Sequence, residues 1–438
     1  MSSSDQTHSI IADSPDYDAV VVGASLGGCA AAIQLGRGGA RVALVEKSPD
    51  PRAFKRICSH FIQASAVPAL ERLELLDPIM AAGGIRSRMR AWTPWGWIDP
   101  PPERAGYAVN LRRERLDPLM RETAAATPGV ELLLGQAAHR LVRDDGVIRG
   151  VVVRGVAGAE TELRARLVVG ADGRDSRIAE LAEVPNNTLP HGRFAYGAYF
   201  EDAMPGGPDS AIWMMDPQWG AAFPTDSGLV FYAAMPTKDR LPEFKLDPEA
   251  ALVSFLADLP DAPPIRSARR VSPVLGKVDM PNRVRVPVAP GLALVGDAAL
   301  TVDPLFGVGC GWALQSAEWL ADCVAPAMRG AEPLERGLAR YRRRHRRELR
   351  GHAFLINDYA TGRRLQPGER MLFAAAARDP KVATAFDEFG TRRIKPSRMF
   401  ATAIPRAIAV NARHSLGRRR GSTPATGSEG RRLETADR

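Results

Sequence analysis

The stretch from residue 18 to residue 46 constrains the fold of this chain more than any other part of its sequence. It opens with a short β-branched run, residues 18–23 (DAVVVG), which predicts a strand buried in a parallel sheet. A glycine-rich turn and a run of small residues, 29–35, follow and predict a helix, and a second strand over 41–46 ends in Glu46. This order of strand, turn, helix and strand predicts an α/β fold built on a parallel sheet.

The turn after the first strand has the features of a dinucleotide site. Gly23 permits a tight turn, Gly28 lets the helix approach the strand, and the first N–H groups of the helix face a pyrophosphate. Ser25 stands where the G-x-G-x-x-G pattern has its middle glycine. Glu46 follows Gly28 by 18 residues, a spacing at which a carboxylate can accept hydrogen bonds from ribose hydroxyls. The motif and its context together predict dinucleotide binding.

Two later strands also end in an aspartate. Residues 167–176 (LVVGADGRDS) place Asp172 in an Asp-Gly turn, and residues 291–299 (GLALVGDAA) place Asp297 after a second apolar run. Residues 303–315 (DPLFGVGCGWALQ) come next and lead into a helical pattern. Taken in order over residues 18–325, these motifs resemble the FAD-dependent hydroxylase and reductase superfamily, which includes aromatic monooxygenases, flavin-dependent halogenases and geranylgeranyl reductases.

The resemblance implies an FAD site whose residues come from all of these motifs. Its members are Gly23, Ser25, Gly28, Glu46, Lys47, Arg56, Arg113, Asp172, Asp297, Gly307 and Gly309. The first glycine turn would lie along the pyrophosphate, Glu46 on the adenosine ribose and Arg56 beside the phosphates. Arg113, in an R-x-x-L-D pattern, would also reach the FAD. Asp172 would organise its own turn, and Asp297 would accept a hydrogen bond from the ribityl chain.

A physical argument supports the last motif independently of the resemblance. Gly307 and Gly309 keep side chains away from the flavin ring. The helix that begins there points its positive end at the pyrimidine edge, where reduced flavin is anionic.

The expected architecture is a Rossmann-like FAD-binding domain with a parallel sheet, an antiparallel-sheet substrate domain and a helical C-terminal region. We assign residues 17–185 and 270–330 to the FAD-binding domain, 186–269 to the substrate domain and 331–412 to the helical region. Residues 1–16 are expected to be a flexible leader, and 413–438 a disordered basic tail. Within the first domain, Asp144-Asp145-Gly146 predicts the turn of a hairpin over residues 131–153.

The substrate domain is rich in aromatic residues that alternate with β-branched ones, a pattern typical of antiparallel strands. In the family that the chain resembles, such a sheet covers a pocket over the flavin, where its inward aromatics meet a planar or apolar substrate. The candidate pocket residues are Tyr196, Trp213, Met215, Phe223 and Pro304.

The resemblance implies a monooxygenase that hydroxylates or epoxidises an aromatic or polycyclic small molecule, in specialised metabolism such as antibiotic biosynthesis. In that reaction NAD(P)H reduces FAD, molecular oxygen adds at C4a, and the resulting hydroperoxyflavin delivers oxygen to an electron-rich carbon. The cofactor carries out the difficult step, so the catalytic residues are unknown and no diagnostic side chain is required. No second dinucleotide motif is visible, so nicotinamide would bind transiently or a partner flavin reductase would supply the electrons.

Two other members of the superfamily offer alternative functions. Lys55 and Cys58 resemble the Lys and Cys that follow the second strand in geranylgeranyl reductases, where reduced flavin gives hydride to an alkene. His60 would then lie nearby as a proton donor, which makes Cys58 and His60 weak catalytic candidates. Halogenases need a lysine early in the FAD domain, and no lysine occurs between Lys55 and Lys238, so halogenation is disfavoured.

Charge and cysteine content exclude several other classes. The chain carries a net charge of +9, but residues 335–350 hold +6 of it and residues 413–438 hold +4, so the remainder is nearly neutral. A solvated helix face and a basic tail explain this excess better than a nucleic-acid surface does. The four cysteines form no C-x-x-C pair, which indicates neither a metal site nor a disulfide framework and fits the cytoplasm. Residues 19–36 lack charge, but their four glycines argue against a transmembrane segment.

Overall fold

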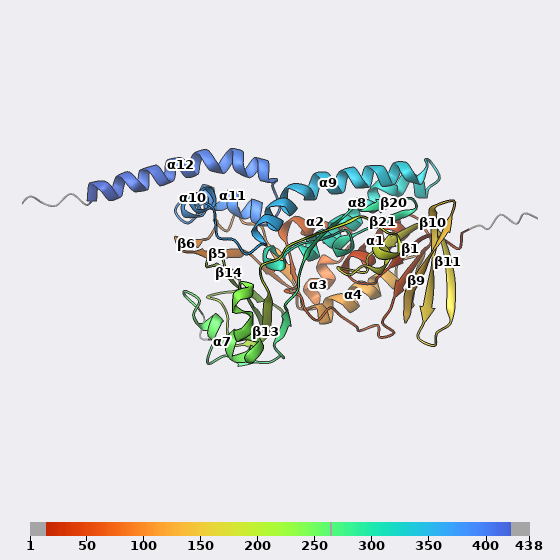
Figure 1. The fold of residues 1–438 in the computed structure, drawn as a ribbon, viewed down its shortest axis with the longest axis horizontal. Helices are drawn as coiled ribbons and strands as arrows, with labels where there is room; N and C mark the ends of the chain where they lie inside the picture. Colours follow the sequence, from red (N-terminus) through yellow and green to blue (C-terminus); the bar gives the residue numbers. More distant parts are fainter. Residues whose placement is uncertain (1–14, 263–264, 422–438) are drawn as a thin grey trace, which may run out of the picture.

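The computed structural model describes residues 15–262 and 265–421 and has the expected mixed α/β architecture (Figure 1). Its centre is a sheet with the strand order β20-β21-β11-β1-β2-β8. All neighbours in this order are parallel except the edge pair β20 and β21. The strands are β1 (Tyr17–Val22), β2 (Val42–Glu46), β8 (Val130–Leu134), β11 (Glu160–Gly170), β20 (Val288–Ala289) and β21 (Leu292–Leu294).

Helices cover one face of the parallel sheet and a hairpin covers the other. The helical side holds α1 (Leu26–Arg37), α2 (Val67–Arg72), α3 (Leu76–Ala81), α4 (Arg113–Ala125) and α8 (Gly309–Met328). On the other side, α5 (Arg177–Leu181) packs with β9 (Gln136–Asp144) and β10 (Val147–Gly155). The hairpin turn is confirmed at Asp145 and Gly146, which both have positive φ, as a turn matching the strand twist requires.

The second large sheet is antiparallel except at one pair. Its order is β17-β13-β16-β15-β14-β5-β6, and β18 also pairs with β13. The pair β14 and β5 is parallel, and β5 and β6 come from residues 89–98, well before the predicted substrate domain at 186–269. The strands are β5 (Met89–Thr93), β6 (Gly96–Ile98), β13 (Ala195–Glu201), β14 (Ser210–Met214), β15 (Trp219–Pro224), β16 (Val230–Met235), β17 (Arg269–Arg270) and β18 (Leu275–Lys277).

The two faces of this sheet contact different parts of the molecule. Helices α6 (Leu241–Leu246) and α7 (Pro248–Ala257) pack on one face. The other face packs with the turn at 304–306 and with the C-terminal helices. Two small sheets link the large ones. They contain β3 (Phe61–Ile62), β4 (Ile85–Ser87) and β7 (Ala108–Asn110), and β12 (Asn186–Leu189), β19 (Asn282–Arg285) and β22 (Leu300–Thr301).

The C-terminal region is helical and lies along one side of the molecule (Figure 1). It contains α9 (Leu334–Tyr359), α10 (Pro367–Ala376), α11 (Pro380–Gly390) and α12 (Pro396–Gly421). Helix α12 continues past residue 412, where the sequence predicted a disordered tail to begin. The segment from 413 to 421 contains no proline and four arginines, which favour a helix, and the helix continues through Gly417. The rest of the predicted tail, 422–438, and residues 1–14 of the predicted leader lie outside the described residues.

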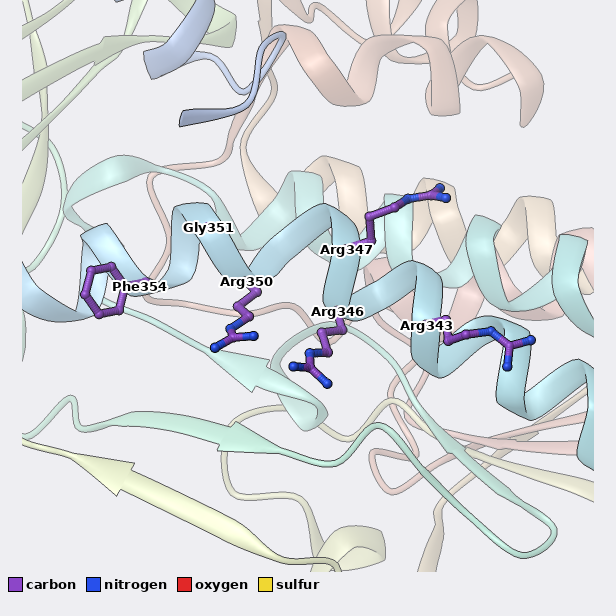
Figure 2. Close-up of a pocket in the computed structure, with 6 residues that line it drawn as sticks. All are labelled: Arg343, Arg346, Arg347, Arg350, Gly351 and Phe354. Atoms are coloured by element: carbon purple, nitrogen blue, oxygen red, sulfur yellow. The ribbon is translucent and has the colours of Figure 1, made fainter. Parts of the chain in front are cut away.

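Helix α9 carries the largest part of the basic excess on its outer side. Leu338, Tyr341 and Leu349 form its buried face. The opposite side presents a hollow open to solvent, which Figure 2 shows lined by Arg343, Arg346, Arg347, Arg350, Gly351 and Phe354. The arginines therefore occupy a solvated helix face, as the sequence pattern predicts. Among the helices that the structure describes, none is long and apolar enough to cross a membrane.

Candidate cofactor and active site

The glycine turn between β1 and α1 has no room for side chains. Gly23 has φ of +104°, and a Cβ added there would lie 2.6 Å from the carbonyl oxygen of Ala171. A Cβ added to Gly28 would lie 1.8 Å from the carbonyl oxygen of Gly23. Glycine is therefore required at both positions, and the turn is pressed against the strand that leads to Asp172.

Glu46 is held at the end of β2 beside this turn. Its carboxylate accepts hydrogen bonds from the backbone N–H of Ala24, at 2.9 Å, and of Ser48, at 3.0 Å. The carboxylate thus lies where the strand ends and the turn begins. Lys47 and Arg56, by contrast, are exposed and make no side-chain hydrogen bond or ion pair within the described chain. The structure brings Glu46 to the turn but does not bring these two cations there.

Arg113 connects the glycine turn to helix α4. Its side chain is only 5% exposed, and its Nη2 donates to Ser25 Oγ at 2.7 Å and to Asp117 Oδ1 at 2.6 Å. Asp117 also accepts a hydrogen bond from the backbone N–H of Lys55 through Oδ2, at 2.9 Å. The arginine and the aspartate of the R-x-x-L-D pattern therefore form one buried pair, which ties α4 to both the turn and the segment after β2.

Cys58 lies beside Arg113 and faces a second cysteine, Cys310, in the first turn of α8. The two Sγ atoms are 3.7 Å apart. The hydrogen bond from Cys310 holds the pKa of Cys58 well below its usual range, and Arg113 and Lys55 act in the same direction against the effect of burial. The same hydrogen bond and burial raise the pKa of Cys310. Sequence reasoning singled out Cys58 but missed Cys310, whose only signal is its position directly after Gly309.

The pair predicts that Cys58 ionises at a lower pH than an ordinary cysteine. An ultraviolet titration of thiolate absorbance in the wild type should therefore show a component that titrates below the ordinary thiol range. Cys58→Ser should abolish it, and Cys310→Ala should shift it to higher pH by removing the hydrogen-bond donor. Cys29→Ser is the control, because burial raises the pKa of Cys29. The assignment fails if Cys58→Ser removes only absorbance that titrates above the ordinary thiol range.

His60 is fully buried and lies against the antiparallel sheet. Its ring stacks on Tyr199 with 5.6 Å between centroids and meets Phe231 edge-on. Its Nδ1 lies 3.3 Å from Tyr199 Oη, and its Nε2 has no partner within the described chain. Burial lowers the pKa of His60 to about 4, so the ring is neutral at physiological pH. Tyr199, which the sequence did not single out, is brought to this position by β13.

The two strand-end aspartates occupy different surroundings. Asp172 accepts hydrogen bonds from Ser176 Oγ at 2.5 Å and from the backbone N–H of Ile178 at 3.0 Å, and so it organises the start of α5. Asp297 lies 3.3 Å from Lys55 Nζ through Oδ2. A Cβ on Gly309 would lie 3.9 Å from its Oδ1, so Asp297 faces the beginning of α8. The strands that lead to these two aspartates, β11 and β21, are neighbours on the same side of β1 in the parallel sheet.

A buried ion network fixes the turn before Gly307. Asp303 accepts hydrogen bonds from the backbone N–H of Leu305 at 2.8 Å and from His191 Nε2 at 3.1 Å, and it lies 3.6 Å from Arg193 Nη1. Arg193 also donates to the carbonyl oxygen of Tyr359 at 2.6 Å. This network joins the substrate sheet, α9 and the glycine loop, and sequence reasoning missed it because its members are far apart in the chain.

An aromatic group covers this loop. A Cβ on Gly307 would lie 2.9 Å from Phe61, whose ring centroid is 5.4 Å from that of Phe223. The ring of Phe306 is 5.5 Å from that of Trp219 and 6.3 Å from that of Tyr359. Phe223 belongs to this aromatic group, and Pro304 begins the turn that the group covers.

The other three candidate pocket residues lie elsewhere. Trp213 is buried with Tyr196 and Met215 in the cluster beneath α6 and α7, on the opposite face of the sheet. Its Nε1 donates to the carbonyl oxygen of Pro260 at 2.7 Å. This placement corrects the expectation that Tyr196, Trp213 and Met215 line the pocket. The alternation of a strand shows which residues share a face. Both faces of this sheet are apolar, because α6 and α7 pack on one and the C-terminal helices pack on the other, so alternation does not show which face meets the pocket.

Among the described residues, no group of three His, Cys, Asp or Glu side chains is placed to hold a metal ion.

Residues 16–353 match the family model described as FAD binding domain. Digeranylgeranylglycerophospholipid reductase 2 of Methanothermobacter thermautotrophicus is 25% identical over 342 residues, covering 76% of this chain and 84% of that protein. 6-methylpretetramide 4-monooxygenase of Streptomyces rimosus is 33% identical over 185 residues, which are 41% of this chain and 43% of that protein.

The fold is also found in a solved structure of p-nitrophenol 4-monooxygenase from Pseudomonas putida. That structure superposes with a TM-score of 0.69 at 21% identity and covers 86% of this chain and 98% of that one.

Proposed function

The chain belongs to the FAD binding domain family, and from this premise we propose that it is an FAD-dependent monooxygenase acting on an aromatic or polycyclic small molecule. The reaction would be hydroxylation or epoxidation. The observation that carries the proposal is the aromatic group packed over the turn that precedes Gly307. A wall of this kind suits a planar apolar substrate and keeps water away from the reacting atoms.

The described residues fit FAD at three places. The turn from Gly23 to Gly28 excludes side chains and would let backbone N–H groups approach a pyrophosphate. Glu46, held by two backbone N–H groups beside that turn, would accept hydrogen bonds from ribose hydroxyls. Asp297 faces the start of α8 and would bind the ribityl chain. Bound FAD would supply two-electron transfer and the activation of molecular oxygen.

The chain's own residues would prepare the site rather than carry out the oxygen transfer. Asp303 fixes the 304–306 turn through the N–H of Leu305, and Arg193 joins that turn to the substrate sheet and to α9. The N-terminus of α8 would favour negative charge on the reduced ring. Electrons would come from NADH or NADPH, directly or through a partner flavin reductase. The partial match to 6-methylpretetramide 4-monooxygenase supports a role in specialised metabolism.

Reduction of a double bond is the second candidate function. Cys58, its partner Cys310 and the buried His60 favour it, because they place a cysteine of lowered pKa and a neutral imidazole beside the residues proposed for FAD. The similarity to digeranylgeranylglycerophospholipid reductase 2 points in the same direction. Here FAD would supply a hydride to one carbon of the alkene, and the other carbon would take a proton that comes from solvent. Neutral His60 would pass this proton on, taking it up at one ring nitrogen while giving one from the other.

Halogenation has less support. The segment in which family halogenases would carry their lysine has Arg86 and Arg88 instead. Arg88 pairs with Asp209 at 2.5 Å, and the Arg86 guanidinium lies 4.8 Å from the centre of the Tyr107 ring. Both cations are engaged, and a guanidinium cannot become the neutral nucleophile that an amine can.

Anaerobic turnover separates the two main candidates. We expect reduced, FAD-loaded enzyme to give no product from a hydroxylated naphthoate without oxygen and to leave a geranylgeranyl lipid unchanged. Cys58→Ser and His60→Ala should then keep aerobic turnover of the aromatic substrate within about threefold, because neither residue takes part in transferring oxygen. If the wild type instead formed saturated lipid without oxygen, and both variants failed to form it, the protein would be a double-bond reductase and not a monooxygenase.

A further inference from the structure

Arg392 is a half-buried arginine in the segment between α11 and α12. Its backbone has φ of +64°, which is rare for a residue other than glycine. Nη1 donates to the carbonyl oxygens of Phe389, at 2.8 Å, and Gly390, at 2.9 Å. The guanidinium lies 5.5 Å from the centre of the Phe306 ring, so it adjoins the aromatic group that covers the flavin motif.

The other side of this guanidinium has no partner. Nε and Nη2 are shielded from solvent and have no hydrogen bond within the described chain. Two acidic residues nearby pair with other cations, Asp387 with Arg393 and Glu348 with Lys395. Burial alone lowers the pKa of Arg392 to about 9. An unpaired buried cation is costly, and such groups are retained mainly where they serve function.

Two neighbouring side chains also have a free polar atom. Gln63 Nε2 donates to the carbonyl oxygens of Phe306, at 2.8 Å, and Gly390, while its Oε1 has no partner in the described chain. His352 Nε2 donates to the carbonyl oxygen of Ile394 at 3.1 Å, which leaves Nδ1 as an unused acceptor. Burial and the charge of Arg392 lower the pKa of His352 to about 3, so it adds no charge.

We propose that Arg392 is a specificity-determining residue that binds an acidic oxygen of the substrate, most simply a carboxylate on an aromatic ring. Nε and Nη2 lie on adjacent positions of one planar fork and can donate to both oxygens of a carboxylate. The Gln63 and His352 acceptors would take hydrogen bonds from a neighbouring hydroxyl. The inference rests on the proposed function, because it uses the aromatic site beside Phe306, and it narrows the substrate to hydroxyaromatic acids.

A binding comparison tests the inference without turnover. The probes are 1-hydroxy-2-naphthoate and its neutral carboxamide, titrated into FAD-loaded enzyme while the visible absorption of the bound flavin is recorded. The wild type should bind the acid roughly ten- to hundredfold more tightly than the amide, as expected for hydrogen bonds to a charged group. Arg392→Gln should remove this preference by weakening the binding of the acid while the binding of the amide stays the same. Arg398→Gln, which removes the same charge from an exposed position of α12, should behave like the wild type.

Equal binding of acid and amide by the wild type, or binding of neither, overturns the inference, as does a preference that survives in Arg392→Gln. Should Arg392→Gln fail to retain FAD, Arg392→Lys provides the comparison, because it keeps the charge but loses the fork and should retain only part of the preference. A wild-type protein that carries no FAD would instead refute the proposed function. If the wild type bound the acid more tightly than the amide but transferred no oxygen, the inference about Arg392 would be retained and only the monooxygenase proposal would be refuted.

Discussion

Gly28→Ala is expected to give a protein that no longer holds FAD and that loses about 3 kcal/mol or more of stability. The added Cβ would lie 1.8 Å from the Gly23 carbonyl oxygen and 3.2 Å from the Ala171 Cβ. Two of the three motifs meet at this point, and the clash is with backbone, so no side-chain rotation can relieve it. The ratio of flavin to protein absorbance and the thermal unfolding midpoint of the purified variant measure the two effects.

Gly27→Ala is the matched control, one position earlier in the same helix. Its Cβ would meet Val295 and Ala313 at 3.5 Å and 3.6 Å, which are ordinary contact distances. Alanine also favours a helix over glycine by about 1 kcal/mol. Gly27→Ala should therefore retain FAD and unfold at or above the wild-type temperature. If Gly28→Ala bound FAD as well as Gly27→Ala does, the close approach of α1 to β1 would not be a requirement of the site.

Arg113→Met is expected to destabilise the protein by about 3–5 kcal/mol. The substitution leaves the Asp117 carboxylate, whose side chain is 2% exposed, without its cation and removes the hydrogen bond to Ser25 Oγ. It also removes one of the charges that stabilise the Cys58 thiolate, so the pKa of Cys58 should rise. Urea unfolding of the purified variant measures the first effect, and the thiolate titration measures the second.

Arg115→Met provides the comparison on the same helix. Arg115 is 46% exposed, and its partner Asp226 keeps a second arginine, Arg112, at 2.8 Å. Its loss should cost less than about 1 kcal/mol. The double variant Arg113→Met with Asp117→Leu should recover part of the stability lost in Arg113→Met, because no buried charge then lacks a partner. A loss below about 1 kcal/mol in Arg113→Met would show that this pair does not support the site.

The parts of the site that the sequence predicted depend on local patterns. The strand, turn and helix from Tyr17 to Arg37 follow from a β-branched run, a glycine at each close approach and a run of small residues. The hairpin turn at Asp145 and Gly146 follows from the demand for positive φ. Asp172 and Asp297 are recognisable because each follows the end of an apolar strand by no more than three residues. In all of these, neighbouring residues determine the conformation, so the order of the chain is enough to predict it.

The parts that the sequence did not predict are contacts across long separations. Cys310 meets Cys58 from 252 positions away, and Arg193 meets Tyr359 from 166 positions away. No periodicity indicates such pairs, because each depends on how the sheets and helices are placed in space. The same reason explains why the sequence did not place Trp213 on the correct face of the sheet, because its alternation with its neighbours fits either face. It also explains Arg392, whose unpaired nitrogens appear only when every nearby partner is known.

Oxygen-18 labelling of the product tests the central claim most directly. FAD-loaded enzyme is reduced under anaerobic conditions and then given oxygen-18 gas in unlabelled water, together with a panel of hydroxylated naphthoates and anthraquinones. For every compound that the enzyme converts, the account predicts a product that carries one labelled oxygen atom, with no conversion when oxygen is withheld. A product without the label, or the same product formed in the absence of oxygen, would contradict the assignment as a monooxygenase.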